Sequence, residues 1–126
     1  MGITYDAGAL IAAERGERQM WARHRALLLR REVPTVPAPA LAQAWRGTAR
    51  QAQLARLTAG CYIETLDEDR AKATGTIASR AKARDIVDAC VVEGAIRRHD
   101  LVITSDPGDL HNIASALGHH LETDHP

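Results

Sequence analysis

The sequence has 126 residues, none of which is phenylalanine, and aromatic residues make up only 3% of the chain. Its core must therefore be built from Leu, Ile, Val and Ala. There are only two cysteines, Cys61 and Cys90, and they lack CxxC spacing and sit in apolar surroundings. This pattern favours buried, reduced thiols and excludes a disulfide framework of the kind found in small secreted proteins.

The chain also lacks a net charge, because 16 Lys and Arg residues balance 16 Asp and Glu residues. The total charge therefore gives no indication of a polyanionic partner such as a nucleic acid. Evidence for such a partner would have to come from the distribution of the charges. No apolar run approaches the ~20 residues of a membrane span. Residues 1–18 have no basic leading segment and carry Asp6 within their apolar part, unlike a signal peptide. We expect a cytoplasmic protein that forms one domain over residues 1–126, without a membrane partner.

Short β-prone runs alternate with helical segments along the whole chain. The predicted strands cover residues 2–6, 33–37, 61–66 and 101–104, with a possible edge strand at 119–123. The predicted helices cover residues 7–16, 17–31, 40–47, 49–60, 67–83, 85–98 and 110–117. This alternation predicts a three-layer α/β/α sandwich around a mostly parallel sheet of about four to five strands.

Aspartates follow two of the predicted strands and open one of the predicted helices. Asp6 ends the first strand, while Asp106 lies just past the strand at 101–104 and Asp109 lies three residues further on. Asp85 and Asp88 open helix 85–98, and their spacing of three residues puts both on one helical face. Ligands of such sheets bind beyond the carboxyl ends of the strands. We therefore expect these acids to converge at one end of the sheet.

Convergence of several carboxylates would require protons or a cation. Two carboxylates ~4 Å apart repel by about 4 kcal/mol at an effective dielectric constant of 20. Mg²⁺ and Mn²⁺ are the usual partners of carboxylate ligands, and such metals suit phosphoryl chemistry.

Each acid also has a simpler interpretation. Asp6 and Asp85 are compatible with helix N-caps, Asp88 with a favourable place in the helix dipole, and the segment SDPGD with a turn followed by a cap. Asp88 fits this interpretation least well, because its neighbours in the sequence are almost all apolar.

Four segments together resemble a known family. The segments ITYDAGALIA, VPAPALAQAWRG, DIVDACVV and VITSDPGDL resemble, in this order, the motifs of PIN-domain nucleases, and more narrowly the VapC toxins of VapBC toxin–antitoxin pairs. The resemblance implies a cytoplasmic, Mg²⁺- or Mn²⁺-dependent endoribonuclease that is a homodimer and is inhibited by a cognate antitoxin. It implies that the cation is held by Asp6, Asp88, Asp106 and Asp109, with support from Asp85 and Thr104.

One position departs from the family pattern. The family typically has Glu in the helix after the proline-flanked strand, and this chain has Gln43 there, which can ligate weakly but brings no charge. Glu14 and Glu17 are conceivable substitutes. The departure leaves open a second hypothesis, a PIN-fold protein with little catalysis that binds RNA or an antitoxin. A phospho-accepting receiver domain fits poorly, since no acidic pair follows the first strand.

Basic residues flank the predicted acidic site on both sides in the sequence. Arg46 and Arg50 follow Gln43, whereas Arg80, Lys82 and Arg84 precede Asp85. They are candidates for binding RNA phosphates, although solvated helix ends are an equally good interpretation. The chain has no aromatic platform for stacking bases, so RNA recognition would depend on phosphates and shape.

Overall fold

A single parallel sheet organises residues 2–126, the part of the chain that the computed structural model describes. Its five strands are β1 (Ile3–Tyr5), β2 (Thr35–Pro37), β3 (Tyr62–Glu64), β4 (Leu101–Ile103) and β5 (Thr123–Asp124). All neighbouring pairs are parallel, and the strand order is β3-β2-β1-β4-β5. The chain thus starts in the middle, builds one side of the sheet, and returns to build the other.

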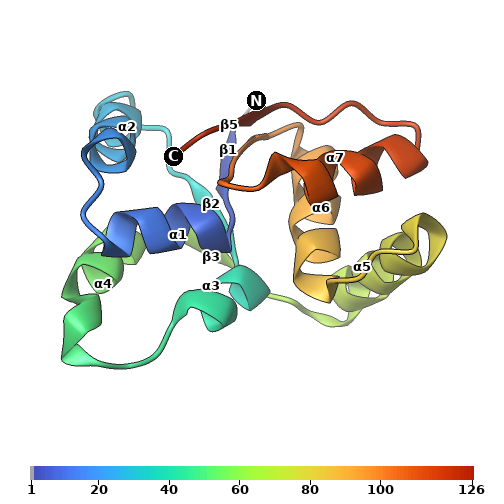
Figure 1. Cartoon of the computed structure of the whole chain (residues 1–126), viewed down its shortest axis with the longest axis horizontal. Helices are drawn as coiled ribbons and strands as arrows, with labels where there is room; N and C mark the ends of the chain where they lie inside the picture. The colour runs from blue at the N-terminus through green and yellow to red at the C-terminus, as the bar shows by residue number, and fades with distance from the viewer. Residues whose placement is uncertain (1) are drawn as a thin grey trace.

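Helices cover both faces of this sheet. They are α1 (Ala7–Glu14), α2 (Arg18–Leu29), α3 (Ala38–Ala44), α4 (Ala52–Ala59), α5 (Glu68–Ala81), α6 (Ile86–Arg98) and α7 (Pro107–Ala116), with a 3-10 turn η1 (Ala49–Gln51) before α4. Figure 1 shows α1, α2 and α4 on one side of the strands and α5, α6 and α7 on the other. The predicted α/β/α sandwich is confirmed.

The alternation of side chains along β4 explains why there are two cores. Ile103 packs with α1, α2 and α4 in one buried cluster, while its neighbour Val102 packs with α6 and α7 in the other. Successive side chains of a strand point to opposite faces, so β4 contributes to both clusters. Leu, Val, Ile and Ala supply most of both cores, as the lack of phenylalanine requires.

Several predicted boundaries need correction. The last helix begins at Pro107 rather than near residue 110, because proline is favoured in the first helical turn, and Asp109 therefore lies inside that turn. The segment predicted as helix 49–60 starts as the 3-10 turn η1, and the last strand is β5 rather than residues 119–123. Cys61 and Cys90 are free thiols, but they are half-buried instead of fully buried. Within residues 2–126, no helix is long and apolar enough to cross a membrane.

Candidate functional site

The strand order creates a switch point between β1 and β4, since the chain leaves β1 toward β2 but returns to pair β4 on the other side. Ligand crevices of parallel sheets form at such points, outside the carboxyl ends of the strands. A cleft of about 350 Å³ opens here. Seven of the residues predicted from the sequence line it, namely Asp6, Gln43, Arg46, Asp85, Asp88, Asp106 and Asp109.

Asp6 is held at the end of β1 by its neighbours. Its Oδ1 accepts a hydrogen bond from the Ala9 amide at 3.0 Å and so caps α1. Burial raises the pKa of Asp6, the nearby charge of Asp106 adds to the rise, and the Thr104 hydroxyl with the Gly8 and Ala9 amides opposes it. Asp6 is therefore both a helix cap and a cleft residue, and the two interpretations of this aspartate are compatible.

The buried Thr104 connects the two strand ends. Its Oγ1 accepts a hydrogen bond from the Asp106 amide at 3.0 Å, and its hydroxyl acts on the pKa of Asp6. Asp106 occupies the N-cap position of α7, yet its side chain makes no capping hydrogen bond. The Asp106 carboxylate therefore lines the cleft without a structural partner at the helix end.

Asp85 and Asp88 enter the cleft from the first turn of α6. Asp85 caps this helix, because its Oδ1 accepts a hydrogen bond from the Val87 amide at 2.7 Å. Asp88 makes no such capping hydrogen bond, and its pKa is raised to about 6, first by burial and then by the charges of Asp85, Asp109, Asp6 and Asp106. In the described part of the chain, none of these five carboxylates forms an ion pair with Lys, Arg or His.

Gly8 and Ser105 also line the cleft, and the sequence reasoning missed both. A Cβ atom at Gly8 would lie 2.3 Å from the Ser105 Oγ and 3.2 Å from the Ser105 backbone nitrogen, so a larger residue would displace the Ser105 hydroxyl and crowd the contact between the start of α1 and the end of β4. A signal for Ser105 was available, because it directly follows Thr104 at the end of a predicted strand. Gly8 had no comparable signal, since its need arises from a residue 97 positions away.

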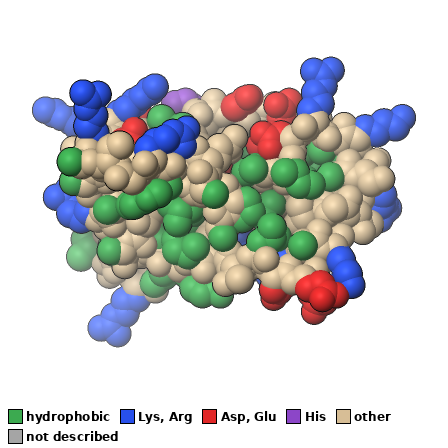
Figure 2. Space-filling model, turned by 90° about the horizontal axis from the view of Figure 1, so that it is seen from below, with side chains coloured by type: hydrophobic (Ala, Val, Ile, Leu, Met, Phe, Trp, Pro, Cys, Tyr) green, Lys and Arg blue, Asp and Glu red, His purple; other side chains and the backbone are tan. Residues whose placement is uncertain are grey.

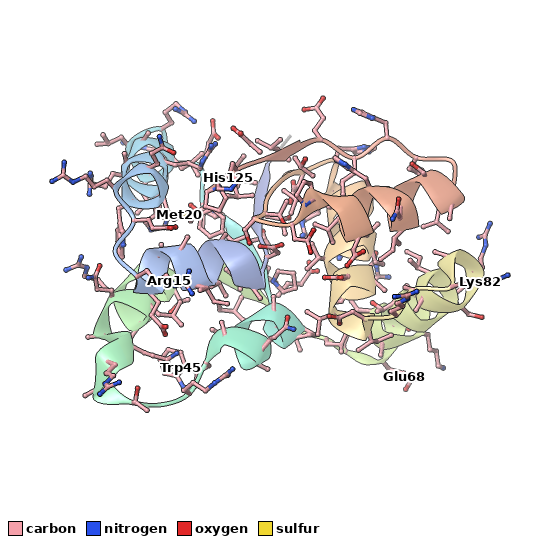
Figure 3. The ribbon with its side chains drawn as sticks, viewed as in Figure 1. Arg15, Met20, Trp45, Glu68, Lys82 and His125 are labelled. Carbon is pink, nitrogen blue, oxygen red and sulfur yellow. The ribbon has the colours of Figure 1, made fainter. Side chains whose placement is uncertain are left out.

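The predicted cations are distributed unevenly around the acids. Arg46 lines the cleft itself, whereas Lys82 and Arg84 line an adjoining groove of about 400 Å³ that shares Asp85, Asp88 and Asp109 with it. Figure 3 shows Lys82 at the far end of α5. Arg50 and Arg80 line neither depression. Figure 2 shows acidic side chains in separate groups around an apolar surface, with basic side chains projecting at both ends of the molecule.

Neither conceivable substitute for the missing glutamate reaches the cleft. The Glu14 carboxylate accepts a hydrogen bond from Gln51 Nε2, and Glu17 lines a separate pocket beside Arg15 and His125. Gln43 therefore lines the cleft without an acidic replacement from α1 or from the start of α2. The adjoining groove instead brings in Asn112, one turn after Asp109 on α7, which the sequence reasoning had not singled out.

The donor chemistry of the cleft fits a hard divalent cation, because carboxylate oxygens are the ligands that Mg²⁺ and Mn²⁺ prefer. The mutual repulsion that raises the Asp88 pKa is the electrostatic condition that such a cation relieves. Across residues 2–126, however, no three His, Cys, Asp or Glu side chains stand close enough together to form a ready ligand set. The carboxylates surround the cleft without closing on one point.

Neither a protein-family model nor a curated protein matches the sequence. Solved structures do match. VapBC2 from Rickettsia felis, solved with a DNA fragment from its promoter, superposes with a TM-score of 0.76 at 11% identity, over 100% of this chain and 99% of that one. FitAB bound to a DNA fragment gives 0.66 at 19% identity, over 98% and 94% of the two chains. A toxin–antitoxin complex from Klebsiella pneumoniae gives 0.65 at 18% identity, over 86% and 89%.

These likenesses extend over most of the length of each chain, and their TM-scores of 0.65 to 0.76 show a shared fold. The chain has the PIN-like α/β fold that its four sequence segments resemble, and the predicted resemblance is confirmed at this level.

Proposed function

We propose that the chain is a metal-dependent endoribonuclease of the VapC toxin type, which hydrolyses RNA phosphodiester bonds. The observation that carries the proposal is the gathering of five unpaired aspartates from three chain segments around one cleft, where burial and mutual repulsion raise the pKa of Asp88 to about 6. Strongly perturbed carboxylates in a cleft are more typical of functional sites than of structural ones. The PIN-like fold supports the same assignment.

Asp6, Asp88, Asp106 and Asp109 would hold Mg²⁺ or Mn²⁺. When bound, the cation polarises the scissile phosphate and lowers the pKa of a water molecule at neutral pH. Thr104 keeps the Asp6 and Asp106 ends of the two strands in register, and Asp85 fixes the first turn of α6 that carries Asp88. Arg46, together with Lys82 and Arg84 in the adjoining groove, binds the phosphates on either side of the scissile one.

The same proposal includes a cognate antitoxin and a homodimer. Its support is the likeness to chains crystallised as VapBC2, as FitAB and as a toxin–antitoxin complex. An antitoxin that covers the cleft would hold the nuclease inactive until it is removed.

A second candidate function is a PIN-fold binding module with weak or absent catalysis. Gln43 favours it, because this side chain lines the cleft without a charge and no acid from α1 or α2 replaces it. Such a protein would bind RNA or the antitoxin without turnover.

Cleavage of a labelled RNA by the purified chain in Mn²⁺ or Mg²⁺ tests the proposal. Asp88→Asn is expected to lower the rate on the order of 100-fold or more, as loss of a group that supports transition-state charge does. Asp69→Asn, an exposed acid on α5, is the matched control and should cleave like the wild type. Equal rates for Asp88→Asn and the wild type would rule out this cleft as the active site.

The variant Gln43→Glu separates the two candidate functions. A gain in cleavage rate means that the wild-type site is a nuclease short of one ligand. Absence of cleavage in the wild type and in Gln43→Glu, with RNA binding retained, would favour the binding module.

A further inference from the structure

Gln51 is a buried polar side chain at the junction of η1 and α4, only 4% exposed. A glutamine side chain offers two donor and two acceptor positions, and here all four are used. Its Oε1 accepts hydrogen bonds from the Arg46 amide at 2.6 Å and from the Gly47 amide at 3.0 Å. Its Nε2 donates to the Ala44 carbonyl at 2.8 Å and to the Glu14 carboxylate.

These four bonds hold the connection between α3 and α4, which Figure 3 marks at Trp45. Helix α3 ends at Ala44, and Gly47 adopts a left-handed conformation with φ of 76°, so the backbone amides of Arg46 and Gly47 lie outside any helix. Gln51 supplies their acceptor. The Glu14 carboxylate only accepts hydrogen bonds, so it draws Nε2 toward α1 and leaves Oε1 facing the connection.

The residue held in this way, Arg46, is the basic residue of the cleft. Arg46 Nη1 donates to the Gln43 carbonyl and to the Trp45 carbonyl, both at 2.9 Å. Of the described residues that line the cleft, Arg46 is the only Lys or Arg. It lies beyond ion-pair distance of the aspartates, so its charge is fixed beside them without neutralising them.

We infer that Gln51 is a positioning residue, which fixes the backbone at Arg46 so that the guanidinium meets a phosphate of a nucleic-acid strand entering the cleft. This inference rests on the proposed function for its substrate class. Among the described residues that line the cleft, Gln51 hydrogen-bonds to Arg46 alone, and it acts through the geometry of residues 44–47.

The four hydrogen bonds of Gln51 form a clamp on residues 44–47. The rate of trypsin cleavage after Arg46 measures how firmly this clamp holds, independently of catalysis. The wild type should resist cleavage there, because both the Arg46 and the Gly47 amides are bonded. Gln51→Ala should be cut at this bond about tenfold faster, as expected for losing roughly 1.4 kcal/mol of local stability. The matched control is Gln53→Ala, an exposed glutamine two residues away on α4. Equal cleavage rates for the two variants would overturn the clamp.

Equilibrium binding of a fluorescent single-stranded RNA measures the consequence. In an Asp88→Asn background, which blocks turnover, Gln51→Ala should weaken binding by about tenfold and reduce the slope of log K against log salt by roughly one phosphate contact. Arg46→Gln should give the same two changes, and the double variant should add little. In the cleavage-competent chain, Gln51→Ala should raise KM more than it lowers kcat.

A charge exchange distinguishes positioning from loss of stability. Gln51→Glu places a second carboxylate beside that of Glu14, and the two repel each other. Glu14→Gln in the same chain restores a hydrogen-bond donor between the two positions. RNA affinity should recover at least partly in the exchanged pair. Unchanged RNA affinity and salt slope in Gln51→Ala would overturn the inference. Failure of the proposed function is a separate result, in which the wild type binds RNA with the Arg46 dependence but does not cleave it.

Discussion

The acids near the two ends of α6 lie in opposite electrostatic settings. Its first turn brings Asp85 and Asp88 into the cleft, where five aspartates lack a basic partner. Its last turn brings Arg97 and Arg98 to the acids of a dense ion-pair network. Arg98 contacts Glu64 at 2.7 Å and Asp100 at 2.9 Å, while Arg97 contacts Glu64 at 2.6 Å and Glu93 at 3.0 Å.

The pKa values of the two groups move in opposite directions for this reason. Burial and, to a smaller extent, the charges of four neighbouring aspartates together raise the pKa of Asp88 to about 6. Burial also tends to raise the pKa of Glu64, but hydrogen bonds and charges from Arg97 and Arg98 outweigh it and lower the value. Acids matched to arginines stabilise the fold, whereas unmatched acids in a cleft retain affinity for a cation. Three predictions test this contrast.

The largest effect is expected from breaking the paired end. Arg98→Ala removes one of the two arginines that pair with Glu64, leaves the buried Asp100 without its ion-pair partner, and removes a hydrogen bond to Thr4. Loss of one member of such a network costs about 3 kcal/mol, or about 10 °C in Tm for a chain of this size. Urea denaturation measures the loss. Lys72→Ala, which breaks an exposed pair with Glu68, should cost less than about 0.5 kcal/mol. Similar losses in both variants would contradict the contrast.

A divalent cation should bind only at the first turn of α6, where the aspartates have no basic partner. At about 100 times its Kd, Mn²⁺ or Mg²⁺ should stabilise the wild type by about 2.7 kcal/mol relative to chelator, a shift of roughly 10 °C in Tm. Asp88→Asn should lose most of this gain, while Arg98→Ala, although less stable, should keep it. Thermal unfolding with and without the cation measures both. If Asp88→Asn gains as much as the wild type, the aspartates are not the ligands.

The smallest effect concerns pH in the absence of divalent cations. Because the folded pKa of Asp88 lies above its usual value, its charged form destabilises the fold, so this cost is absent below about pH 4 and complete above about pH 6. Asp88→Asn should therefore be more stable than the wild type at pH 7.5 by about 1 kcal/mol, after allowance for solvent screening, and equally stable near pH 4.

Glu64→Gln should show the reverse sign. The pKa of Glu64 is lower in the folded state than in the unfolded state, so the charged carboxylate stabilises the fold at pH values above its usual pKa. This contribution is lost as the pH falls through the folded pKa. The variant should be less stable than the wild type at pH 7.5, with a difference that shrinks under acid conditions. Unfolding curves between pH 4 and 7.5 for both variants measure these trends, and parallel trends would contradict the contrast.

Much of the cleft could be predicted from the sequence, because its members occupy positions that local rules identify. Asp6 and Asp106 follow strands, and Asp85 opens a helix whose apolar pattern is long and regular. In a parallel sheet these positions must meet at one edge. Asp109 was identified for the same reason, although the helix that carries it begins earlier than predicted.

The clamp and the arginine network could not be predicted in the same way. Gln51 sits in an ordinary helical segment, and nothing in its neighbours indicates four hydrogen bonds to α1, α3 and the connection between α3 and α4. Arg97 and Arg98 read as basic residues at the end of a helix, where the helix dipole alone explains them. Their partner Glu64 lies 33 residues or more before them in the sequence.

By itself, the sequence determined the alternation of strands and helices, a core built mainly from aliphatic residues, and the set of aspartates that reach the edge of the sheet. These depend on spacing and on which residues begin and end each element. Only the tertiary structure decided which acids are neutralised and which are not. That outcome depends on distances between segments far apart in the chain, and the same carboxylate stabilises the fold beside an arginine and destabilises it beside other aspartates.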